Sequence, residues 1–405
     1  MEKYLQKLVQ TYSYKHILKN KMRILNNMFL LLLLQFNGCI QEQNSSNIKN
    51  DFIQNKITLK HASNFKISYE GSHKIIEVIQ PYSEAKKSLK YRLIPKADKD
   101  KNKQNLYNEM VIYTPVETFV CTSTTHIAPL DMLGATDKLT GFPSTQYVSS
   151  EKVRKQVKSG KTIELGKDND LNIELLMELS PDLVMSYTMN GNYDQLSSIE
   201  RVGIPVVMNA EYLEKTPLGR AEWIKFVSLF FNMEMKADSI FDQIEKNYIK
   251  IRNTTTNLTN KPTIMSGIVY GDTWYVPGGK SWMAKFFRDA GTNYLWNNEQ
   301  STGSLQLSFE AVYEKSQNAE YWIGAANYFS LNELNNVDYR YTNFKAFETK
   351  NIYSYNARVI KNGGNDYFES GFSRPDIILS DLVKILHPEL LPEHNLYYFR
   401  KLDEK

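Results

Sequence analysis

Side chains that could bind a metal ion or activate a nucleophile are few in this chain and lie far apart. The 405 residues include six histidines and two cysteines. A transition-metal site needs several imidazole, thiolate or carboxylate groups that converge on one point. Only His126 falls in a loop that we expect to face a cleft. We therefore expect no bare zinc or manganese site and no resident cofactor.

Motifs of common enzyme classes are also missing from the sequence. No Gly-x-Ser-x-Gly nucleophile elbow occurs, and no Gly-x-Gly-x-x-Gly sequence follows a predicted strand. Residues 276–281, VPGGKS, lack the four-residue spacer after a first glycine that a phosphate-binding loop requires. We interpret this segment as a turn that leads into a helix. An enzyme is therefore the weaker hypothesis.

Two stretches of the chain alternate short apolar strands with short helices. In residues 118–216, the strands TFVCTS, PDLVMSY and IPVVMNA alternate with helices such as NIELLMELS and QLSSIERVG. Residues 261–405 repeat the alternation, from the strand PTIMSGIVY to the helix PDIILSDLVKILHP. Such alternation predicts crossover units around a parallel sheet. We therefore expect an α/β fold with two Rossmann-like lobes.

Residues 217–260 have a helical pattern and separate the two lobes. Ala237, Phe241, Ile244 and Tyr248 recur at three- and four-residue spacing, which predicts one apolar stripe on a helix of about five turns. Before the first lobe, residues 57–117 alternate apolar and polar side chains as strands do. The expected order is a β-rich N-terminal extension, a first lobe, a single long interdomain helix and a second lobe.

The N-terminal part of the chain contains an apolar run, Met28 to Phe36, that is too short to cross a membrane. A bilayer core of about 30 Å needs roughly 20 apolar residues in a helix. Basic residues precede the run and Gly38-Cys39 follows it, which resembles the lipobox of bacterial lipoproteins. The resemblance implies a signal peptide over residues 1–38 and a lipid on Cys39. The following Gln-, Asn- and Ser-rich residues up to 56 suit a flexible tether.

Removal of such a signal changes the charge of the chain. Residues 1–38 carry a net +5, so the formal charge falls from +4 to about −1 in the mature protein. A near-neutral body gives no reason to expect nucleic-acid binding. Acylation of Cys39 would leave only Cys121 and would exclude a disulfide. Met22 or Met28 could be the true start, and the apolar run could instead form a helix packed on the body.

Four segments resemble the substrate-binding proteins of ABC importers for iron–siderophore complexes, haem and cobalamin. NIELLMELSPDLVMSY is similar to the family's Asn-x-Glu-x-x-x-x-Leu-x-Pro-Asp-Leu-Val segment, and LSFEAVYEKSQNAEYWI occupies the equivalent place in the second lobe. EYLEKTPLGRAEWIKF and SRPDIILSDLVKILHPELL resemble a subgroup common in Bacteroidetes. The resemblance covers roughly Ile57 to Leu402. It implies the class III periplasmic binding protein fold, in which a rigid helix joins two α/β lobes.

The resemblance also implies a docking role for two glutamates. In this family one glutamate on each lobe docks into arginine pockets of the membrane permease, and the matching positions here are Glu174 and Glu310. Carboxylate–guanidinium pairing is bidentate and directional, so two widely spaced acids can orient a two-lobed body on its partner. Each glutamate stands near a predicted helix start, and stabilisation of that helix alone is the alternative.

The ligand is expected between the lobes, where loops leave the carboxyl ends of the strands. Aromatic faces would suit a bulky planar complex, and basic side chains would suit its anionic oxygens. The candidate contacts are Thr125, His126, Tyr187, Trp274, Tyr275, Trp282 and Arg340. His126 could be an axial ligand of haem iron. A structural role is the alternative for each of these residues.

These observations favour a monomeric, lipid-anchored protein that faces the periplasm. It would capture an iron–siderophore, haem or cobalamin-type complex between its lobes and deliver it to an ABC permease in the inner membrane. A ligand-binding sensor without a transporter is the alternative. The identity of the ligand and of the membrane that holds the lipid stay open.

Overall fold

A computed structural model describes residues 56–99, 109–167, 170–189, 191–360 and 363–405 of the chain. The contacts within the chain divide it into Met1–Lys56 and a folded body, Ile57–Lys405. The predicted signal peptide, Cys39 and all of the tether except Lys56 lie outside the described residues.

The N-terminal extension forms a four-stranded sheet in the order β1-β2-β3-β4. Strands β1 to β3 pair antiparallel, and β3 and β4 pair parallel. Apolar side chains of this sheet, such as Phe65, Ile76 and Leu93, join the core of the first lobe. The strands are β1 (Phe65–Glu70), β2 (His73–Val78), β3 (Leu89–Pro95) and β4 (Met110–Thr114).

The first lobe contains a parallel five-stranded sheet in the order β11-β10-β5-β6-β7. The strands are β5 (Phe119–Cys121), β6 (Leu139–Phe142), β7 (Ile163–Glu164), β10 (Leu183–Ser186) and β11 (Val206–Met208). The connecting helices are α3 (Ile127–Leu133), α4 (Glu151–Lys158), α5 (Ile173–Leu179) and α6 (Asp194–Arg201), with a small hairpin of β8 (Gly166–Lys167) and β9 (Asp170–Leu171). The α/β alternation expected from the sequence is therefore present.

The second lobe has a five-stranded sheet in the order β15-β12-β17-β18-β19, in which only β19 is antiparallel. Its strands are β12 (Thr263–Ser266), β15 (Asn293–Tyr294), β17 (Tyr321–Ile323), β18 (Ile352–Ser354) and β19 (Arg400–Lys401). A separate antiparallel sheet consists of β13 (Ile268–Tyr270), β14 (Thr273–Pro277) and β16 (Ser304–Leu307). The helices are α10 (Trp282–Asp289), α11 (Phe309–Ser316), α12 (Leu331–Val337), α13 (Lys345–Glu348), α14 (Asp366–Glu369) and α15 (Pro375–Leu386).

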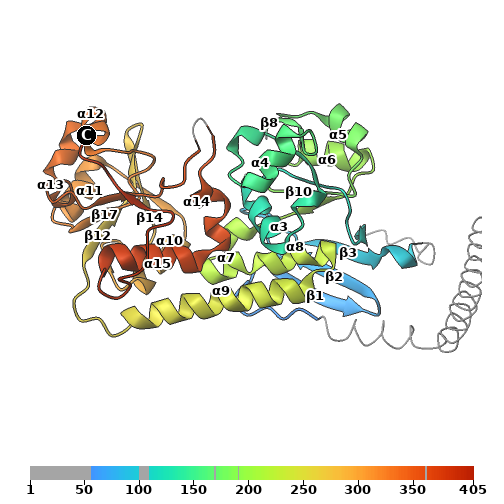
Figure 1. The fold of residues 1–405 in the computed structure, drawn as a ribbon, viewed down its shortest axis with the longest axis horizontal. Helices are drawn as coiled ribbons and strands as arrows, with labels where there is room; N and C mark the ends of the chain where they lie inside the picture. Colours follow the sequence, from blue (N-terminus) through green and yellow to red (C-terminus); the bar gives the residue numbers. More distant parts are fainter. Residues whose placement is uncertain (1–55, 100–108, 168–169, 190, 361–362) are drawn as a thin grey trace, which may run out of the picture. The chain divides into compact units, whose positions relative to one another are not determined.

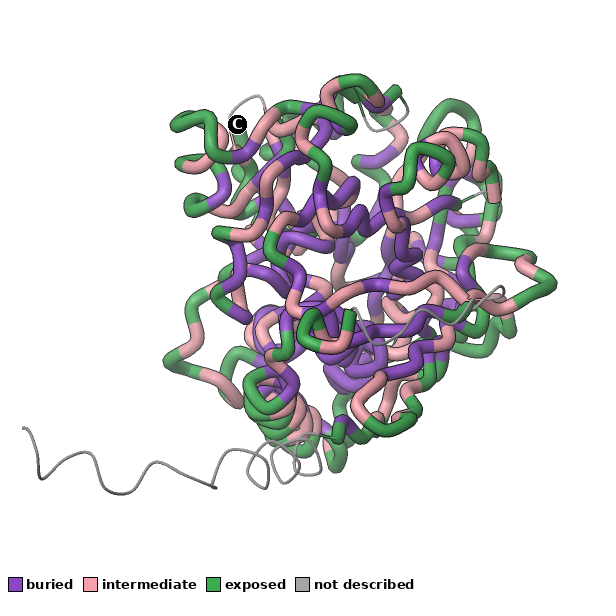
Figure 2. Tube along the Cα trace, turned by 90° about the vertical axis from the view of Figure 1, so that its right-hand side faces the viewer, coloured by how far each residue is buried: buried purple, intermediate pink, exposed green. Residues whose placement is uncertain are grey.

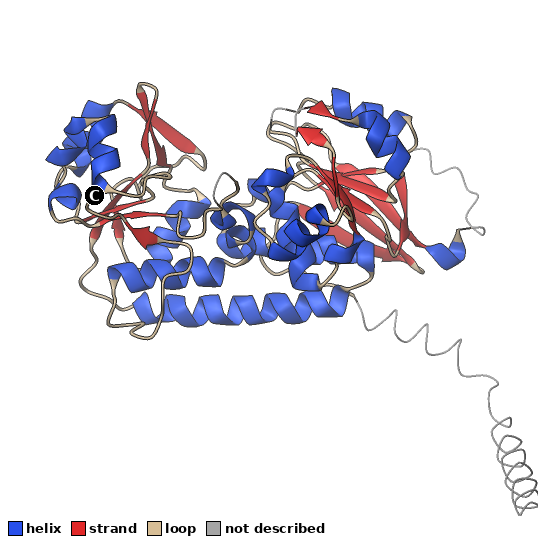
Figure 3. Ribbon diagram, turned by 45° about the horizontal axis from the view of Figure 1, so that its top comes forward, coloured by secondary structure: helices blue, strands red, loops and turns tan. Residues whose placement is uncertain are grey.

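One long helix, α9 (Glu234–Thr255), connects the lobes and runs beneath both of them (Figures 1 and 3). At 1.5 Å per residue its 22 residues extend about 33 Å. Ala237 and Phe241 enter the core of the first lobe, whereas Tyr248 enters the core of the second. The apolar stripe expected from the sequence is thus divided between two cores.

Two shorter helices precede α9 and also tie the lobes together. In α7 (Pro217–Ala221), Leu218 belongs to the core of the second lobe and Ala221 to that of the first. Every residue of α8 (Trp223–Phe231) is buried. Figure 2 shows buried residues along the inner strands and helices, and exposed residues on the outer loops.

Residues 57–64 do not form the strand that their apolar alternation suggested. Their backbone N–H groups bond to side chains instead. The carboxylate of Glu222 accepts hydrogen bonds from the N–H groups of Lys60, His61 and Ala62, and that of Glu214 accepts from Ser63 and Asn64. The two buried acids hold the segment as a strap against the helices.

Candidate functional site

The carboxyl ends of β5 and β10 bring together three of the predicted ligand contacts. The turn η2 (Thr124–His126) follows β5, and its N-cap, Ser123, shares a 2.9 Å hydrogen bond with the hydroxyl of Thr125. Tyr187 directly follows β10. The rings of His126 and Tyr187 meet edge to face, with centroids 6.2 Å apart. This proximity agrees with the rule that parallel strands present their loops on one edge.

His126 is electrically neutral in this environment. Its side chain is only 1% exposed, and burial lowers its pKa to about 4, although the carboxylate of Glu211 and a backbone hydrogen bond with Met185 act in the opposite direction. Its Nδ1 atom has no hydrogen-bond partner among the described residues. A neutral imidazole with a free nitrogen can bind a metal, but a ligand could reach this one only after the surrounding residues move.

The structure does not support Trp274 as a ligand contact. Its side chain is 0% exposed and packs among Phe309, Trp322, Tyr341 and Phe344 in the core of the second lobe. The expectation failed because neighbouring side chains of a strand point to opposite faces. Tyr275, the next residue of β14, is 38% exposed and remains a candidate.

Trp282 lies where the two lobes meet. Its ring is 5.1 Å from that of Phe372 in an edge-to-face contact. The guanidinium of Arg220, from α7, lies 3.6 Å from the Phe372 ring and 5.3 Å from the Trp282 ring. Arg220 also forms a buried ion pair with Glu211. Trp282 therefore packs against a buried cation and contributes to the contact between the lobes.

Arg340 lies beside Glu310, one of the two predicted docking residues. Its Nη1 is 3.3 Å from the Glu310 carboxylate, and its guanidinium covers the Phe309 ring at 4.0 Å. Its closest ion pair is with Asp338 at 2.7 Å, and this pairing lowers the pKa of Asp338. The charge of Arg340 is thus already paired with two acids, and its role as a ligand contact stays a prediction.

Glu174 and Glu310 occupy equivalent positions in their helices. Each is the second residue of a helix, and each helix has a capping side chain, Asn172 for α5 and Ser308 for α11. Both glutamates are exposed. An N-terminal helix position favours an acidic side chain, and both side chains are accessible to a partner.

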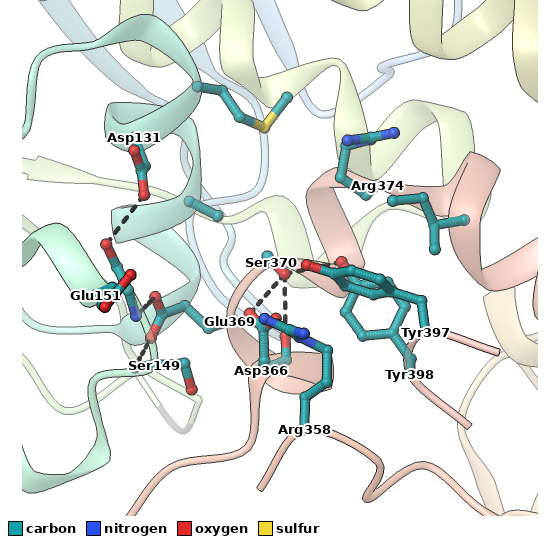
Figure 4. A pocket seen from close by; sticks show the side chains of 14 residues that line it. Asp131, Ser149, Glu151, Arg358, Asp366, Glu369, Ser370, Arg374, Tyr397 and Tyr398 are labelled. Atoms are coloured by element: carbon teal, nitrogen blue, oxygen red, sulfur yellow. Dashed lines mark hydrogen bonds and ion pairs between the residues drawn. The ribbon is translucent and has the colours of Figure 1, made fainter. Parts of the chain in front are cut away.

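A cavity of about 360 Å³ lies between helices of the two lobes (Figure 4). Its walls come from α3 and the start of α4 on one side, and from α14, α15 and the C-terminal segment on the other. The principal polar residues around it are Asp131, Ser149, Ser150, Glu151, Arg358, Asp366, Glu369, Ser370, Arg374, Tyr397 and Tyr398. None of them is among the seven ligand contacts expected from the sequence, because residues of the two walls are up to about 270 positions apart, from Ala128 to Tyr398.

Charges on the second-lobe wall of this cavity are mostly paired. Arg358 bonds to Asp366 at 2.7 Å and lies 4.3 Å from the Tyr397 ring. Arg374 pairs with Asp376 at 2.9 Å. Glu369 differs, since it is 2% exposed and has no basic partner among the described residues. Burial raises its pKa to about 8, opposed by hydrogen bonds from the Ser149 and Ser150 backbone.

The described residues contain neither a metal-binding cluster nor a membrane-spanning helix. No group of three or more His, Cys, Asp or Glu side chains in this part of the chain is arranged to hold a metal ion. Within the same residues, no helix has both the length and the apolar character needed to cross a membrane.

Two α/β lobes joined by one long helix are the architecture of a bilobal solute-binding protein. A sequence model described as periplasmic binding protein matches residues 119–359, which is more than half of the chain. The chain therefore belongs to the periplasmic binding protein family, and its fold is class III. Proteins of this family bind solutes and are not enzymes.

Two curated relatives are lipoproteins of Methanocaldococcus jannaschii. Uncharacterized lipoprotein MJ0878 is 27% identical over 92% of this chain and 94% of its own length. Uncharacterized lipoprotein MJ0872 is 27% identical over 74% of this chain and 77% of its own length.

Solved structures with low sequence identity share the fold. A possible iron-binding protein of Staphylococcus epidermidis has a TM-score of 0.52 at 16% identity, covering 68% of this chain and 100% of its own. The triscatecholate siderophore binding protein FeuA of Bacillus subtilis has a TM-score of 0.51 at 12% identity, covering 68% and 94%. The haem binding protein HutB of Vibrio cholerae has a TM-score of 0.50 at 16% identity, covering 65% and 99%.

Proposed function

We propose that this chain is the substrate-binding lipoprotein of an ABC importer for an iron–siderophore, haem or cobalamin-type complex. The membership of the chain in the periplasmic binding protein family carries the proposal. Two similar structures, FeuA and HutB, are named for a ferric siderophore and for haem. The relatives named as lipoproteins support lipidation of Cys39 and attachment to a membrane on its periplasmic side.

The ligand would contact side chains of both lobes. In the first lobe these are Thr125, Tyr187 and, after local movement, His126. In the second lobe they are Tyr275 and Trp282. Tyr187 and Trp282 are both partly buried, so each offers an aromatic surface that a planar complex can cover.

Glu174 and Glu310 would dock on the two halves of the permease. Glu174 has no ion-pair partner among the described residues, whereas Glu310 lies 3.3 Å from Arg340. A permease arginine would therefore have to replace Arg340 beside Glu310. Exposed ion pairs of this kind contribute only about 0–1 kcal/mol, so the exchange is energetically accessible.

Two measurements test this function. The first is the visible absorbance of the protein purified from its native host, because haem, ferric siderophores and corrinoids have distinct bands. The second compares uptake of the identified ligand by cells that express the wild type or the double variant Glu174→Ala/Glu310→Ala. We expect uptake to be lost while the affinity for ligand is unchanged, because both docking side chains are exposed and neither is one of the proposed ligand contacts.

The matched control for the double variant is Glu178→Ala/Glu314→Ala, which removes one exposed acid from each of the same two helices. We expect this control to transport normally. Uptake that survives the loss of Glu174 and Glu310 would reject the docking role and would favour a ligand sensor without a transporter.

A further inference from the structure

The two lobes are connected by more than the long helix, because α14 of the second lobe lies against the first. In Figure 1, α14 stands between the two sheets. It packs against the turn η2 that carries His126. The contact therefore joins the second lobe to the strand end of β5, beside the predicted ligand contacts of the first lobe.

Glu369, the last residue of α14, bonds directly to the first lobe. Its carboxylate accepts hydrogen bonds from the backbone N–H groups of Ser149 and Ser150, the latter at 2.7 Å. These residues immediately precede α4, and Ser150 is its N-cap. Figure 4 shows the Glu369 side chain reaching this backbone across one end of the cavity. A side chain of one lobe thus satisfies N–H groups that a helix start leaves without intrahelical partners.

A second close contact lies beside the first. Gly364 is buried against the turn η4 (Thr145–Tyr147), and a Cβ atom at this position would lie 1.7 Å from the carbonyl oxygen of Tyr147. No other residue type fits without separating the two segments. The short approach requires glycine for space, because the φ angle of Gly364 is not positive.

We propose that Gly364 and Glu369 form an interlobe latch that holds the two lobes together at this side of their junction. The latch consists of these two residues with Tyr147, Ser149 and Ser150. It goes beyond the proposed function, because it is a property of the free protein and needs neither ligand nor permease. Ligand capture on the strand ends would then depend on whether the latch is closed.

The protonation state of Glu369 makes the latch sensitive to pH. In the closed latch, burial raises the pKa of Glu369 to about 8, against an ordinary value of 4.5 for a solvated glutamate. The closed latch therefore binds a proton more tightly than the open one. Protonation of Glu369 therefore stabilises the closed latch. This contribution is fully present below about pH 4.5, declines as the pH rises to about 8 and is absent above that.

Titratable and charged groups of several elements surround Glu369. They are Cys121 of β5, His126 of η2, Asp131 of α3, Glu151 of α4, Asp366 of α14, and Arg358, Arg374, Tyr397 and Tyr398. Burial keeps the pKa of His126 near 4 and raises that of Cys121, so neither side chain becomes charged between about pH 5 and 8.

The test measures the distance between the lobes by electron paramagnetic resonance. Spin labels are attached at Lys155→Cys on α4 and Glu348→Cys on α13, in the full chain carrying Cys39→Ser. Cys121 is buried and does not compete for the label. We expect Glu369→Ala to shift the distance distribution outward and broaden it. Glu369→Gln, which resembles the protonated form, should keep the wild-type distribution.

Two further variants make the result decisive. Gly364→Val should open the latch as Glu369→Ala does, and it tests the contact at a different point. Glu151→Gln is the matched control, because Glu151 lines the same cavity but its side chain is 82% exposed. Circular dichroism identifies any variant that fails to fold, and the other latch variant then carries the test.

The same spin labels measure how the distance between the lobes depends on pH. The wild-type distribution should move outward as the pH rises from about 5 to about 8.5, and Glu369→Gln should show no such movement. Wild-type distances in both Glu369→Ala and Gly364→Val would overturn the proposal. This experiment involves neither ligand nor permease. Rejection of the latch would therefore leave the proposed uptake function untouched, and rejection of the uptake function would leave the latch untouched.

Discussion

At the scale of single residues, burial decides which aromatic side chains can meet a ligand. Trp274 and Tyr275 are adjacent and have similar chemistry, yet one is 0% exposed and the other 38% exposed. Strand β14 points Trp274 toward the apolar core, where its Nε1 atom donates to the Ser266 carbonyl at 3.3 Å. Side-chain type alone therefore overstates the number of ligand contacts in the second lobe.

This difference predicts effects of very different size for two neighbouring substitutions. Trp274→Ala should lower the free energy of unfolding by about 3–5 kcal/mol, because it removes a large side chain from a packed aromatic core. Tyr275→Ala should change it by less than about 0.5 kcal/mol. Urea unfolding of the two variants measures both values. Equal stability losses would contradict the placement of Trp274 in the core.

At the scale of elements, the strap of residues 57–64 is attached to the helices by buried carboxylates. Glu222 is 0% exposed, accepts three backbone hydrogen bonds from the strap and pairs with Lys225 at 3.0 Å. Lys225 is 1% exposed and also donates to the carbonyl of Thr58 at 2.8 Å. The N-terminal extension is thereby fastened to α7, α8 and the first half of α9.

Removal of Glu222, the buried acid that holds the strap, should strongly destabilise the folded protein. Glu222→Ala leaves a buried lysine with one fewer counter-ion and three N–H groups without an acceptor, at a cost of about 3–5 kcal/mol. Thermal or urea unfolding measures this loss. Lys60→Ala is the control, because it keeps the backbone bond and removes only solvent-accessible ion pairs, which contribute about 0–1 kcal/mol. Similar losses of stability in both variants would contradict the role of Glu222 in holding residues 57–64.

At the scale of the folded body, α9 behaves as a shared wall of two cores. Its first half is buried against the first lobe through Ala237 and Phe241, and its second half against the second lobe through Tyr248, whose hydroxyl donates to Asp289 at 2.7 Å. It also packs along α8 and α15. A helix held at both ends is a stiff connection, so changes on binding should occur in loops and at the latch.

Hydrogen–deuterium exchange tests this expectation. With a saturating amount of haemin, a ferric siderophore or cyanocobalamin, whichever binds, protection should increase in the segments around residues 123–126 and 187–189. Residues 237–252 should change little, since their helix is packed in both states. Large protection changes inside 237–252 would contradict a rigid interdomain helix.

The architecture was predictable because each element has a local signature. Period-two apolar patterns, three- and four-residue spacing in α9 and the segment around Glu174 are all local, and they indicated two α/β lobes and one connecting helix. Part of the candidate site was also predictable. His126 and Tyr187 follow parallel strands of one sheet, so topology alone brought them together.

Other parts of the site depend on contacts between distant residues. Arg340 pairs with Glu310 because α11 and the turn at 339–343 pack together, which no spacing shows. Glu369 bonds to backbone groups 219 and 220 residues away. Backbone N–H groups are present in nearly every residue, so the sequence contains no signal for this bond.

By itself, the sequence determined the class of fold, the family and the two exposed helix-start glutamates, because hydrophobic periodicity and capping act over a few residues. Only the tertiary structure decided which aromatic side chains are buried, where Arg340 pairs and how α14 meets the first lobe. Those outcomes depend on how complete elements pack, and packing energies are sums over contacts between segments that are remote in the chain.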